Sequence, residues 1–478
     1  SANDHEHLKT MSTLIFILIT LTLLLGTGYL IFLLIKTGKE WYFLIFFILY
    51  LPMYITLQSF VFQQTQSPTG VLIIQYLKEF VLFIALSVFV FYQSDLLRKK
   101  FKFNNIDLVF MAFILLAFIF LVFPIGEVAF LAKAAYFKNI LLMGIFYFLG
   151  RNMTLSNYQI QLIFKLILGI AFSAFCINLA EFSSGIHLHT LINYGNFQNT
   201  INDVEPTGNY GLSWTFETQS GIQRFGAFFA NPLDLASASL LAFAIAFIFF
   251  IKTPYRTNQI FYSGLMMAII GSLFFAHSRA SLAAFILELI FIAFIFKYYR
   301  LLWAGVFLIF SSVVYIMYFA SEDLYFFVID TLTFENASSL GHLIEWFEGI
   351  ESMIDSPEGI GLAMSGNGNG IEDENRVSGE NQFLIFGVQM GILGLLLYIS
   401  LLYLAIKTSI QSYRKALTPN EQIISFVAGT TKFALLLPLF TANAELYLFV
   451  SLFSWWLVGQ SVKIKNSPVV LPHAIPHD

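Results

Sequence analysis

The sequence predicts an all-α, polytopic integral membrane protein with about 12 or 13 transmembrane helices and one large loop outside the membrane. Two observations carry this prediction. First, 58% of the 478 residues are hydrophobic, only 11% are charged, and the mean hydropathy is +0.76. A water-soluble core could not bury so much apolar surface, so lipid must be the solvent for much of the chain. Second, the apolar residues form long runs without the alternation that marks a barrel strand.

Runs of about 17–25 apolar residues are long enough to cross the hydrocarbon core as helices. Six runs precede the first long polar connection: Thr13–Ile35, Trp41–Phe62, Val71–Tyr92, Ile106–Phe123, Ala134–Leu149 and Tyr158–Leu179. Seven more follow it: Leu233–Ile251, Ile260–Ala276, Ala280–Phe296, Leu301–Ala320, Gln382–Ile406, Ile423–Phe440 and Leu446–Val462. Lipid offers backbone amides no hydrogen-bond partners, so each run is expected to be a helix. Residues 1–478 are treated as one transmembrane domain.

Basic residues in the short connections set the predicted orientation. Counting spans puts these residues on one side of the membrane: Arg98, Lys99, Lys100, Lys102, Lys252, Arg256, Lys297, Arg300, Lys407, Arg414, Lys415, Lys463 and Lys465. The positive-inside rule makes that side cytoplasmic. Residues 181–232 and 321–381 then form two outer loops. The orientation of the N-terminus depends on whether the spans number twelve or thirteen.

The second outer loop, residues 321–381, is the longest polar stretch and is rich in acidic residues. Its Asn367–Gly370 run beside Glu372–Glu374 lacks the ligand spacing of an EF-hand, so a flexible loop is the favoured interpretation. The lone Cys176 rules out a disulfide framework and a cysteine-based metal site. A net charge of −4 without a basic block gives no indication of nucleic-acid binding. No metal ion or cofactor is expected.

Ionisable residues inside predicted spans are functional candidates, because a charge in the membrane is costly. These residues are Lys78, Glu79, Glu288 and Lys432. For Lys78 and Glu79, pairing with neighbours to fix helix packing is an equally good interpretation. Lys133 and Lys138 enter the fifth span from the outer face, where snorkelling to lipid headgroups is the favoured explanation.

Two arginines on the outer face point more clearly to a ligand. Arg224 precedes the seventh span, and Arg279 lies in the short turn between the eighth and ninth spans. The positive-inside rule makes arginine less expected there, so each needs a reason. A guanidinium binds phosphate with a planar fork, and two of them at headgroup depth would suit a diphosphate. The alternatives are contact with lipid headgroups and a salt bridge to the acidic loop.

The order of motifs from Arg224 onwards resembles the superfamily of O-antigen polymerases and ligases, which assemble bacterial surface polysaccharides. The segments that carry the resemblance are Arg224–Pro232, Ser278–Ala280, His342–Trp346, Ile354–Gly361, Gly379–Leu384 and Gly391–Leu395. The resemblance covers roughly Arg224 to Tyr403, and the earlier helices match only in hydropathy. Each motif alone is weak, whereas their common order and topology are moderately specific.

The resemblance implies a metal-independent glycosyltransferase of the GT-C-like membrane type, in the bacterial inner membrane, with its active site facing the periplasm. It would move a growing glycan from one undecaprenyl-diphosphate carrier onto the sugar of another. Arg224 and Arg279 would stabilise the leaving diphosphate, with Lys78, Lys133 and Lys138 as further contacts. A chain-length regulator and a flippase would be partners in the membrane.

Two departures from the family pattern bear on the branch. His342 stands where members commonly carry arginine, and Glu380-Asn381 stands where ligases show a His-Asn pair. The resemblance therefore favours the polymerase branch and offers Glu380 as the general base, with His342 as the second candidate. One more solvated carboxylate is the simpler interpretation of Glu380. A ligase acting on lipid A-core or protein is the close alternative, and a polytopic transporter or lipid flippase is the alternative from another class.

Overall fold

The computed structural model describes residues 2–92, 102–126, 128–218, 221–318, 329, 337–366, 376–377 and 379–467. Part of the basic connection after the third span, Arg98–Lys100, lies outside the described residues. So do most of residues 319–336 and the Asn367–Gly370 and Glu372–Glu374 runs of the second loop. The candidate site residues predicted from the sequence all lie within the described part.

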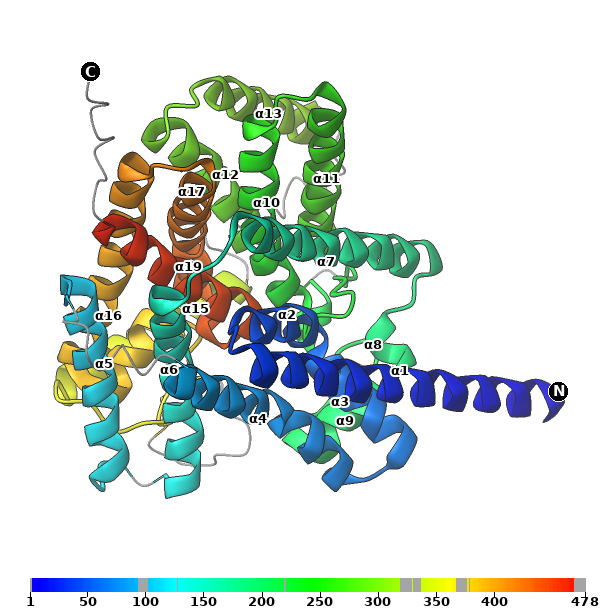
Figure 1. Ribbon diagram of the computed structural model, residues 1–478. Coiled ribbons are helices and arrows are strands. Elements are labelled where there is room, and N and C mark those ends of the chain that lie inside the picture. Colours follow the sequence, from blue (N-terminus) through cyan, green and yellow to red (C-terminus); the bar gives the residue numbers. More distant parts are fainter. Residues whose placement is uncertain are drawn as a thin grey trace, which may run out of the picture.

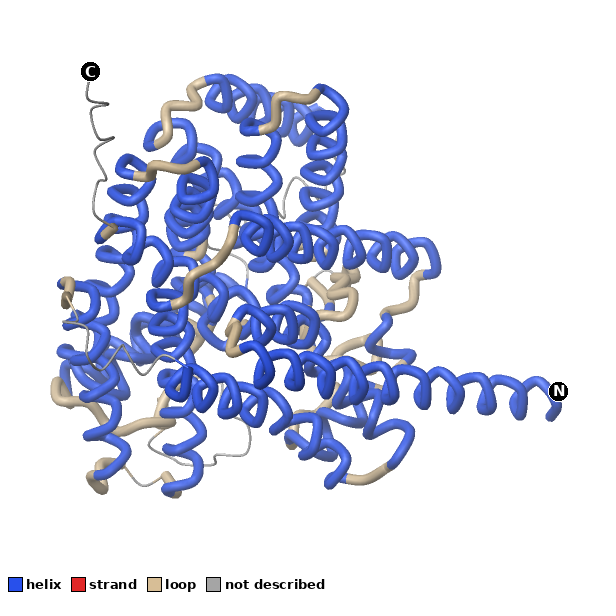
Figure 2. Tube along the Cα trace, in the orientation of Figure 1, coloured by secondary structure: helices blue, strands red, loops and turns tan. Residues whose placement is uncertain are grey.

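The described residues form helices joined by mostly short connections (Figures 1 and 2). The first half of the chain contains α1 (Ala2–Thr37), α2 (Trp41–Tyr50), η1 (Leu51–Met53), α3 (Tyr54–Thr65), α4 (Pro68–Tyr92), α5 (Asn105–Val122), α6 (Phe130–Asn152), α7 (Asn157–Ser184), α8 (Leu188–Leu191), α9 (Tyr194–Asn202) and η3 (Trp214–Phe216). The second half contains α10 (Pro232–Lys252), α11 (Arg256–Phe275), α12 (Arg279–Ile295), α13 (Arg300–Tyr318), α15 (Ala337–Asp355), α16 (Gln382–Lys415), α17 (Pro419–Ala434), α18 (Leu436–Thr441), η4 (Ala444–Leu446) and α19 (Leu448–Asn466).

Ten helical segments in the described part of the chain are long and apolar enough to cross a membrane. They are Phe16–Thr37, Trp41–Thr65, Pro68–Tyr92, Asn105–Val122, Phe130–Asn152, Asn157–Ser184, Pro232–Lys252, Arg256–Phe275, Gln382–Lys415 and Pro419–Thr441. The other three predicted spans are α12, α13 and α19, helices that fall below the same requirement for length or mean hydropathy. Every predicted span therefore coincides with a helix, which confirms an all-α, multi-pass membrane protein.

α19 lies inside the bundle, and residues 449–462 are all buried. Its backbone touches that of α6: a Cβ on Gly459 would lie 2.1 Å from the carbonyl oxygen of Tyr147, and one on Gly150 would lie 2.2 Å from that of Trp456. Only glycine permits two membrane helices to approach so closely. Because protein rather than lipid surrounds α19, this helix tolerates polar residues that a lipid-facing span would exclude.

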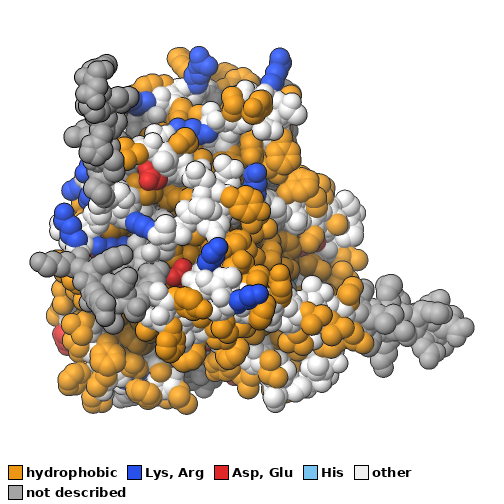
Figure 3. All heavy atoms as spheres, viewed as in Figure 1, with side chains coloured by type: hydrophobic (Ala, Val, Ile, Leu, Met, Phe, Trp, Pro, Cys, Tyr) orange, Lys and Arg blue, Asp and Glu red, His pale blue; other side chains and the backbone are white. Residues whose placement is uncertain are grey.

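Apolar side chains cover most of the visible face of the molecule, with Lys and Arg side chains standing among them (Figure 3). α1 extends from the bundle towards the N-terminus and is largely exposed along its apolar length (Figure 1). Exposed Phe, Leu and Ile side chains at such density would be unstable in water. They are the expected lipid-facing surface of a membrane protein.

α16 is broken one quarter of the way along. Met390 and Gly391 have non-helical backbone angles, and the Gly391 φ of 73° lies in the region that favours glycine. Residues 357–361 occupy the break: Ile392 N donates to Pro357 O (2.9 Å), and Ile360 N donates to Val388 O (2.9 Å). The break therefore leaves these backbone groups satisfied, as membrane depth requires.

Candidate active site

The connection that carries Arg224, described for residues 203–218 and 221–231, is hydrogen-bonded to the end of α7. The Glu181 carboxylate accepts hydrogen bonds from Leu188 N (2.8 Å) and Ala227 N (3.1 Å). Arg224 N itself donates to Phe216 O (2.8 Å). A buried carboxylate at the end of one span thus fixes the backbone on both sides of the loop. Within the first predicted outer loop, 181–232, hydrogen bonds therefore hold the described residues around Arg224 in place.

Arg279 reaches the same place from the turn between α11 and α12. Phe225 N, next to Arg224, donates to Phe275 O at the end of α11 (3.0 Å). Arg279 is the first residue of α12, and the Ser278 hydroxyl caps that helix by accepting from Ser281 N (3.3 Å). A helix N-terminus carries partial positive charge, so backbone and side chain both favour an anion here.

Arg224 and Arg279 lie near each other and near His277, and these three residues are here called the arginine cluster. Burial and, after it, the charge of Arg279 lower the pKa of Arg224 to about 10. Burial and the charge of Arg224 lower the pKa of His277. Arg224 Nε is buried and has no hydrogen-bond partner among the described residues. The fold therefore holds together cations that repel one another, an arrangement that a bound anion would stabilise.

Glu380 and His342 also lie together. His342 Nδ1, on α15, is 3.7 Å from Glu380 Oε2 and 3.9 Å from Glu345 Oε2. Burial and the charge of Glu380 raise the pKa of Glu345. The two candidates for the general base thus share one site, the Glu380 cluster, although neither distance is that of a short hydrogen bond.

A pocket adjoins the Glu380 cluster, between α15 and the start of α16. Glu345, Trp346, Gly379 and Asn381 contribute to its lining. Asn381 caps α16, since its side-chain oxygen accepts hydrogen bonds from Phe383 N (3.0 Å) and Leu384 N (3.3 Å). Within the Glu380-Asn381 pair, Asn381 therefore has a structural role.

Tyr447 lies in the turn before α19, and the charges of Glu380 and Asp234 both act on it. Tyr447 has a raised pKa, because of burial and then because of the charges of Glu380 and Asp234. Asp234 belongs to the first turn of α10, which follows the loop of Arg224 directly. Sequence reasoning did not single out Tyr447, whose aromatic character matched the apolar run around it.

Lys78 and Lys138 are both engaged with Glu79. Lys78 Nζ is buried and lies 2.7 Å from Tyr54 Oη, 2.8 Å from Gln75 O and 3.3 Å from Glu79. Lys138 Nζ lies 2.8 Å from the same Glu79 oxygen. The pairing interpretation of Lys78 and Glu79 therefore describes what is seen. A role of these lysines in diphosphate binding stays a prediction.

Lys133 does not snorkel to the membrane surface, and that expectation was wrong. Its side chain is buried, and Nζ donates to the carbonyl oxygens of Ile125 (2.5 Å) and Gly126 (3.0 Å). Those carbonyls lie within the connection between α5 and α6, outside both helices, and have no helical partner of their own. Gly126 packs on the backbone of Ile360 so tightly that a Cβ would lie 2.4 Å from its oxygen. Lys133 thus stabilises a turn that supports residues 357–361.

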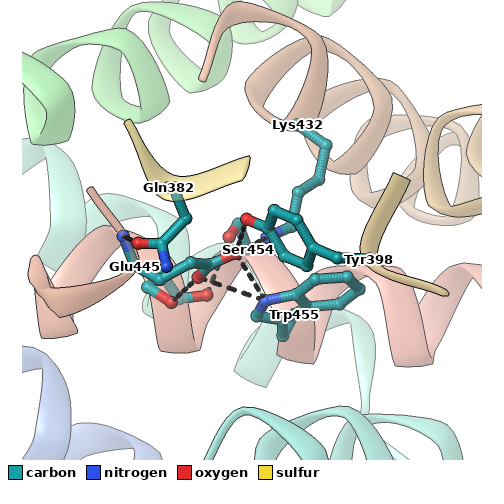
Figure 4. A network of polar contacts seen from close by, with 7 residues as sticks. Gln382, Tyr398, Lys432, Glu445, Ser454 and Trp455 are labelled. Carbon is teal, nitrogen blue, oxygen red and sulfur yellow. Dashed lines mark hydrogen bonds and ion pairs between the residues drawn. The ribbon is translucent and has the colours of Figure 1, made fainter. Parts of the chain in front are cut away.

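Lys432 belongs to a buried network that has Glu445 at its centre (Figure 4). The Glu445 carboxylate accepts from Tyr398 Oη (2.8 Å), Trp455 Nε1 (3.3 Å) and the Ser451 hydroxyl, and lies 3.9 Å from Lys432 Nζ. Its backbone amide donates to the Gln382 side chain (3.3 Å). The network joins α16, α17 and α19. Its member Gln382 is the first residue of α16 and lies two residues after Glu380 in the sequence.

The sequence analysis did not identify Glu445 as a buried residue. It follows the twelfth predicted span, where an acidic residue is expected to be solvated in an outer connection. The pairing with Lys432 could have been suspected from the cost of a lone intramembrane lysine. Glu288, the other intramembrane acid, is fully buried, and neither carboxylate oxygen has a hydrogen-bond partner in the part of the chain described. No chemistry follows from that placement alone.

Comparison with protein families supports the resemblance stated above over part of the chain. Residues 264–399 match a family model described as O-antigen ligase. The match spans Arg279, His342 and Glu380 and begins after Arg224. Comparison with curated proteins finds no match. The chain is therefore similar, from the middle of α11 to the middle of α16, to the O-antigen ligase family, a similarity that supports surface-glycan synthesis or ligation and does not separate polymerase from ligase.

Proposed function

We propose that the protein polymerises lipid-linked oligosaccharide repeats into a surface polysaccharide by glycosyl transfer at the outer leaflet. The family match supports a role in surface-glycan assembly in general. The observation that carries the proposal is the arginine cluster, in which two guanidinium groups from separate connections are held together at a helix N-terminus. Such a site suits the diphosphate that leaves when a glycan is moved off its undecaprenyl carrier.

In the proposed reaction the acceptor sugar hydroxyl attacks the anomeric carbon of the donor glycan. Glu380 takes the hydroxyl proton as the new carbon–oxygen bond forms. The bond to the diphosphate oxygen breaks, and the diphosphate leaves with its electron pair, stabilised by Arg224 and Arg279. His342, 3.7 Å from Glu380, holds the carboxylate in place and is the second candidate for the base.

Lys78, Lys133 and Lys138 enter the proposal as further diphosphate contacts of lower rank. Each already has a partner within the protein: Glu79 for Lys78 and Lys138, backbone carbonyls for Lys133. An ammonium that is fully engaged loses those contacts on turning to a ligand. Arg224 Nε has no hydrogen-bond partner among the described residues, so Arg224 takes the first role.

A ligase that transfers finished glycan to lipid A-core or to protein is the second candidate, favoured by the description of the matching family model. The presence of Glu380-Asn381 where the ligases that the chain resembles show a His-Asn pair favours the polymerase. The two differ in what accumulates when the reaction stops.

The test is a gel of surface and lipid-linked glycans from a strain in which the gene is deleted. A polymerase predicts that long chains vanish while single repeats persist, on carrier or on core. Long chains that persist on the carrier lipid would instead identify a ligase. An unchanged glycan profile would remove both candidates and return attention to transport.

A further inference from the structure

α15 presents a row of large apolar side chains to its surroundings. The row consists of Leu340, Ile344, Phe347, Ile350 and Ile354, which are 45–73% exposed. Spacings of four, three, three and four residues put them on one face of the helix. We call this face the α15 stripe. A polar segment of a water-soluble loop would not be expected to expose five such residues in register.

The opposite face of α15 packs against the protein. The α15 stripe is therefore not the face with which the helix packs on the rest of the bundle. A Cβ on Gly349 would lie 3.4 Å from Leu384, and one on Gly387 would lie 2.6 Å from the sulfur of Met353. The Trp346 ring lies 4.6 Å from that of Phe440 at the end of α18. α15 is thereby fixed to the first turns of α16 with its stripe turned away from them.

The C-terminal end of α15 reaches the level at which α16 faces lipid. Pro357, two residues after α15 ends, accepts a hydrogen bond from Ile392 N (2.9 Å). Ile392, Leu393 and Leu396 begin the exposed apolar surface of the spanning part of α16, at 44–56% exposure. Ile354, the most exposed residue of the α15 stripe, lies only three residues before Pro357. The stripe is therefore continuous with a lipid-facing surface.

The charges of α15 lie towards one side of the stripe. Glu348 and Asp355 are exposed at its edge beside Ile344, and the exposed Glu351 falls within it, between Leu340 and Ile344. No Lys or Arg occurs in Ala337–Asp355. Attraction to anionic headgroups therefore contributes nothing, and burial of apolar area must provide the binding free energy.

We propose that α15 lies in the headgroup–acyl boundary of the membrane, with the α15 stripe in contact with lipid. His342 and Glu345 lie on the far side of the helix from the stripe, so the Glu380 cluster is held about one helix diameter, roughly 10 Å, above the acyl chains. The contact with lipid is argued from exposure and packing and does not depend on the proposed function.

The test places a nitroxide label on α15 and measures what collides with it. In full-length protein with Cys176→Ser, reconstituted in phosphatidylethanolamine–phosphatidylglycerol vesicles, single cysteines are introduced as Phe347→Cys and Ile354→Cys. Oxygen concentrates in lipid, whereas a water-soluble nickel chelate does not enter it. Oxygen collisions are expected to exceed nickel collisions severalfold at both positions.

Two matched positions calibrate the measurement. Ile392→Cys, on the lipid-facing part of α16, should show the lipid pattern, and Glu348→Cys, on the acidic edge, should show the reverse. Predominant nickel collisions at Phe347→Cys and Ile354→Cys would put the stripe in water and overturn the proposal. Low collision rates with both reagents would mean that a second protein chain covers the stripe, which would overturn it equally. Neither readout uses enzymatic activity.

Discussion

The protein holds two of its cations, Lys432 and Arg224, in contrasting surroundings. Lys432 lies against the Glu445 carboxylate and over the Trp455 ring, at 3.7 Å from the ring centre, so its charge is balanced from within. Arg224 is half-buried near His277 and Arg279, and its buried Nε atom has no hydrogen-bond partner in the described structure. Both placements cost desolvation, and within the described residues a carboxylate offsets that cost for Lys432. In the proposed function, Lys432 supports the fold, whereas Arg224 is held for a ligand.

The largest expected effect is a loss of stability when the pair of Lys432 and Glu445 is broken. Glu445→Ala leaves Lys432 buried without its counter-charge, so the unfolding free energy should fall by about 3–5 kcal/mol. Thermal unfolding of purified protein in detergent measures the loss. Replacing both partners, Lys432→Met with Glu445→Gln, should recover most of the stability because no charge is then left uncompensated. Unfolding of Glu445→Ala at the parental temperature would break the comparison.

The next effect is on activity, from the arginine cluster. Arg224→Ala removes one of two groups proposed to stabilise the leaving diphosphate, so chain extension should slow by about 10²–10³-fold. Removing a charge from a repulsive cluster should leave the thermal stability unchanged or raised. Glycan length on gels from complemented deletion cells, with immunoblots of the membrane fraction, measures both.

Arg256→Ala is the matched control for this prediction, because Arg256 is exposed at the start of α11, at the opposite end of that helix from the cluster. It should leave glycan length unchanged. Arg224→Lys keeps the charge but loses the planar fork, so it should recover only part of the activity. Glycans of normal length in Arg224→Ala would remove this arginine from the mechanism.

A smaller effect is expected at the Glu380 cluster. Glu380→Gln keeps the shape of the side chain but cannot accept a proton, so transfer should slow by about 10²-fold, at the low end for a general base. Stabilisation of the protein by added undecaprenyl diphosphate should persist, since the arginines are intact. Glu348→Gln, on the exposed side of α15, is the control. Unchanged turnover in Glu380→Gln would sink the base assignment.

The membrane spans were predictable because hydropathy acts locally. Lipid requires each spanning segment to satisfy its own backbone, so long apolar runs become helices whatever their neighbours do. The order of spans also predicted that Arg224 and Arg279 would lie on the same side, and the structure brings them together. Packing between spans was not predictable in this way. The partner of Lys432, the carbonyl ligands of Lys133 and the break of α16 at Gly391 all depend on which helices meet.

The amphipathic character of α15 is visible in the sequence but was not predicted. Leu340, Ile344, Phe347 and Ile354 have helical spacing in the printed sequence, yet the acidic residues among them made the segment read as a polar loop. Charge content describes a segment as a whole, whereas an amphipathic helix is defined by where its charges lie around the axis. The helical spacing of these apolar residues therefore predicts α15 better than the charge content of residues 321–381 does.

The smallest expected effect concerns Lys138, which lies half-exposed beside Glu79. Its substitution tests whether this lysine belongs with the cations paired inside the protein or with those proposed to bind ligand. Lys138→Ala leaves Glu79 paired with Lys78 at 3.3 Å, so stability should change by less than about 1 kcal/mol, as for other partly exposed pairs. If Lys138 only balances Glu79, glycan length in complemented cells should also stay normal. A loss of chain extension as large as that of Arg224→Ala, at normal protein level, would instead place Lys138 with the ligand-binding cations.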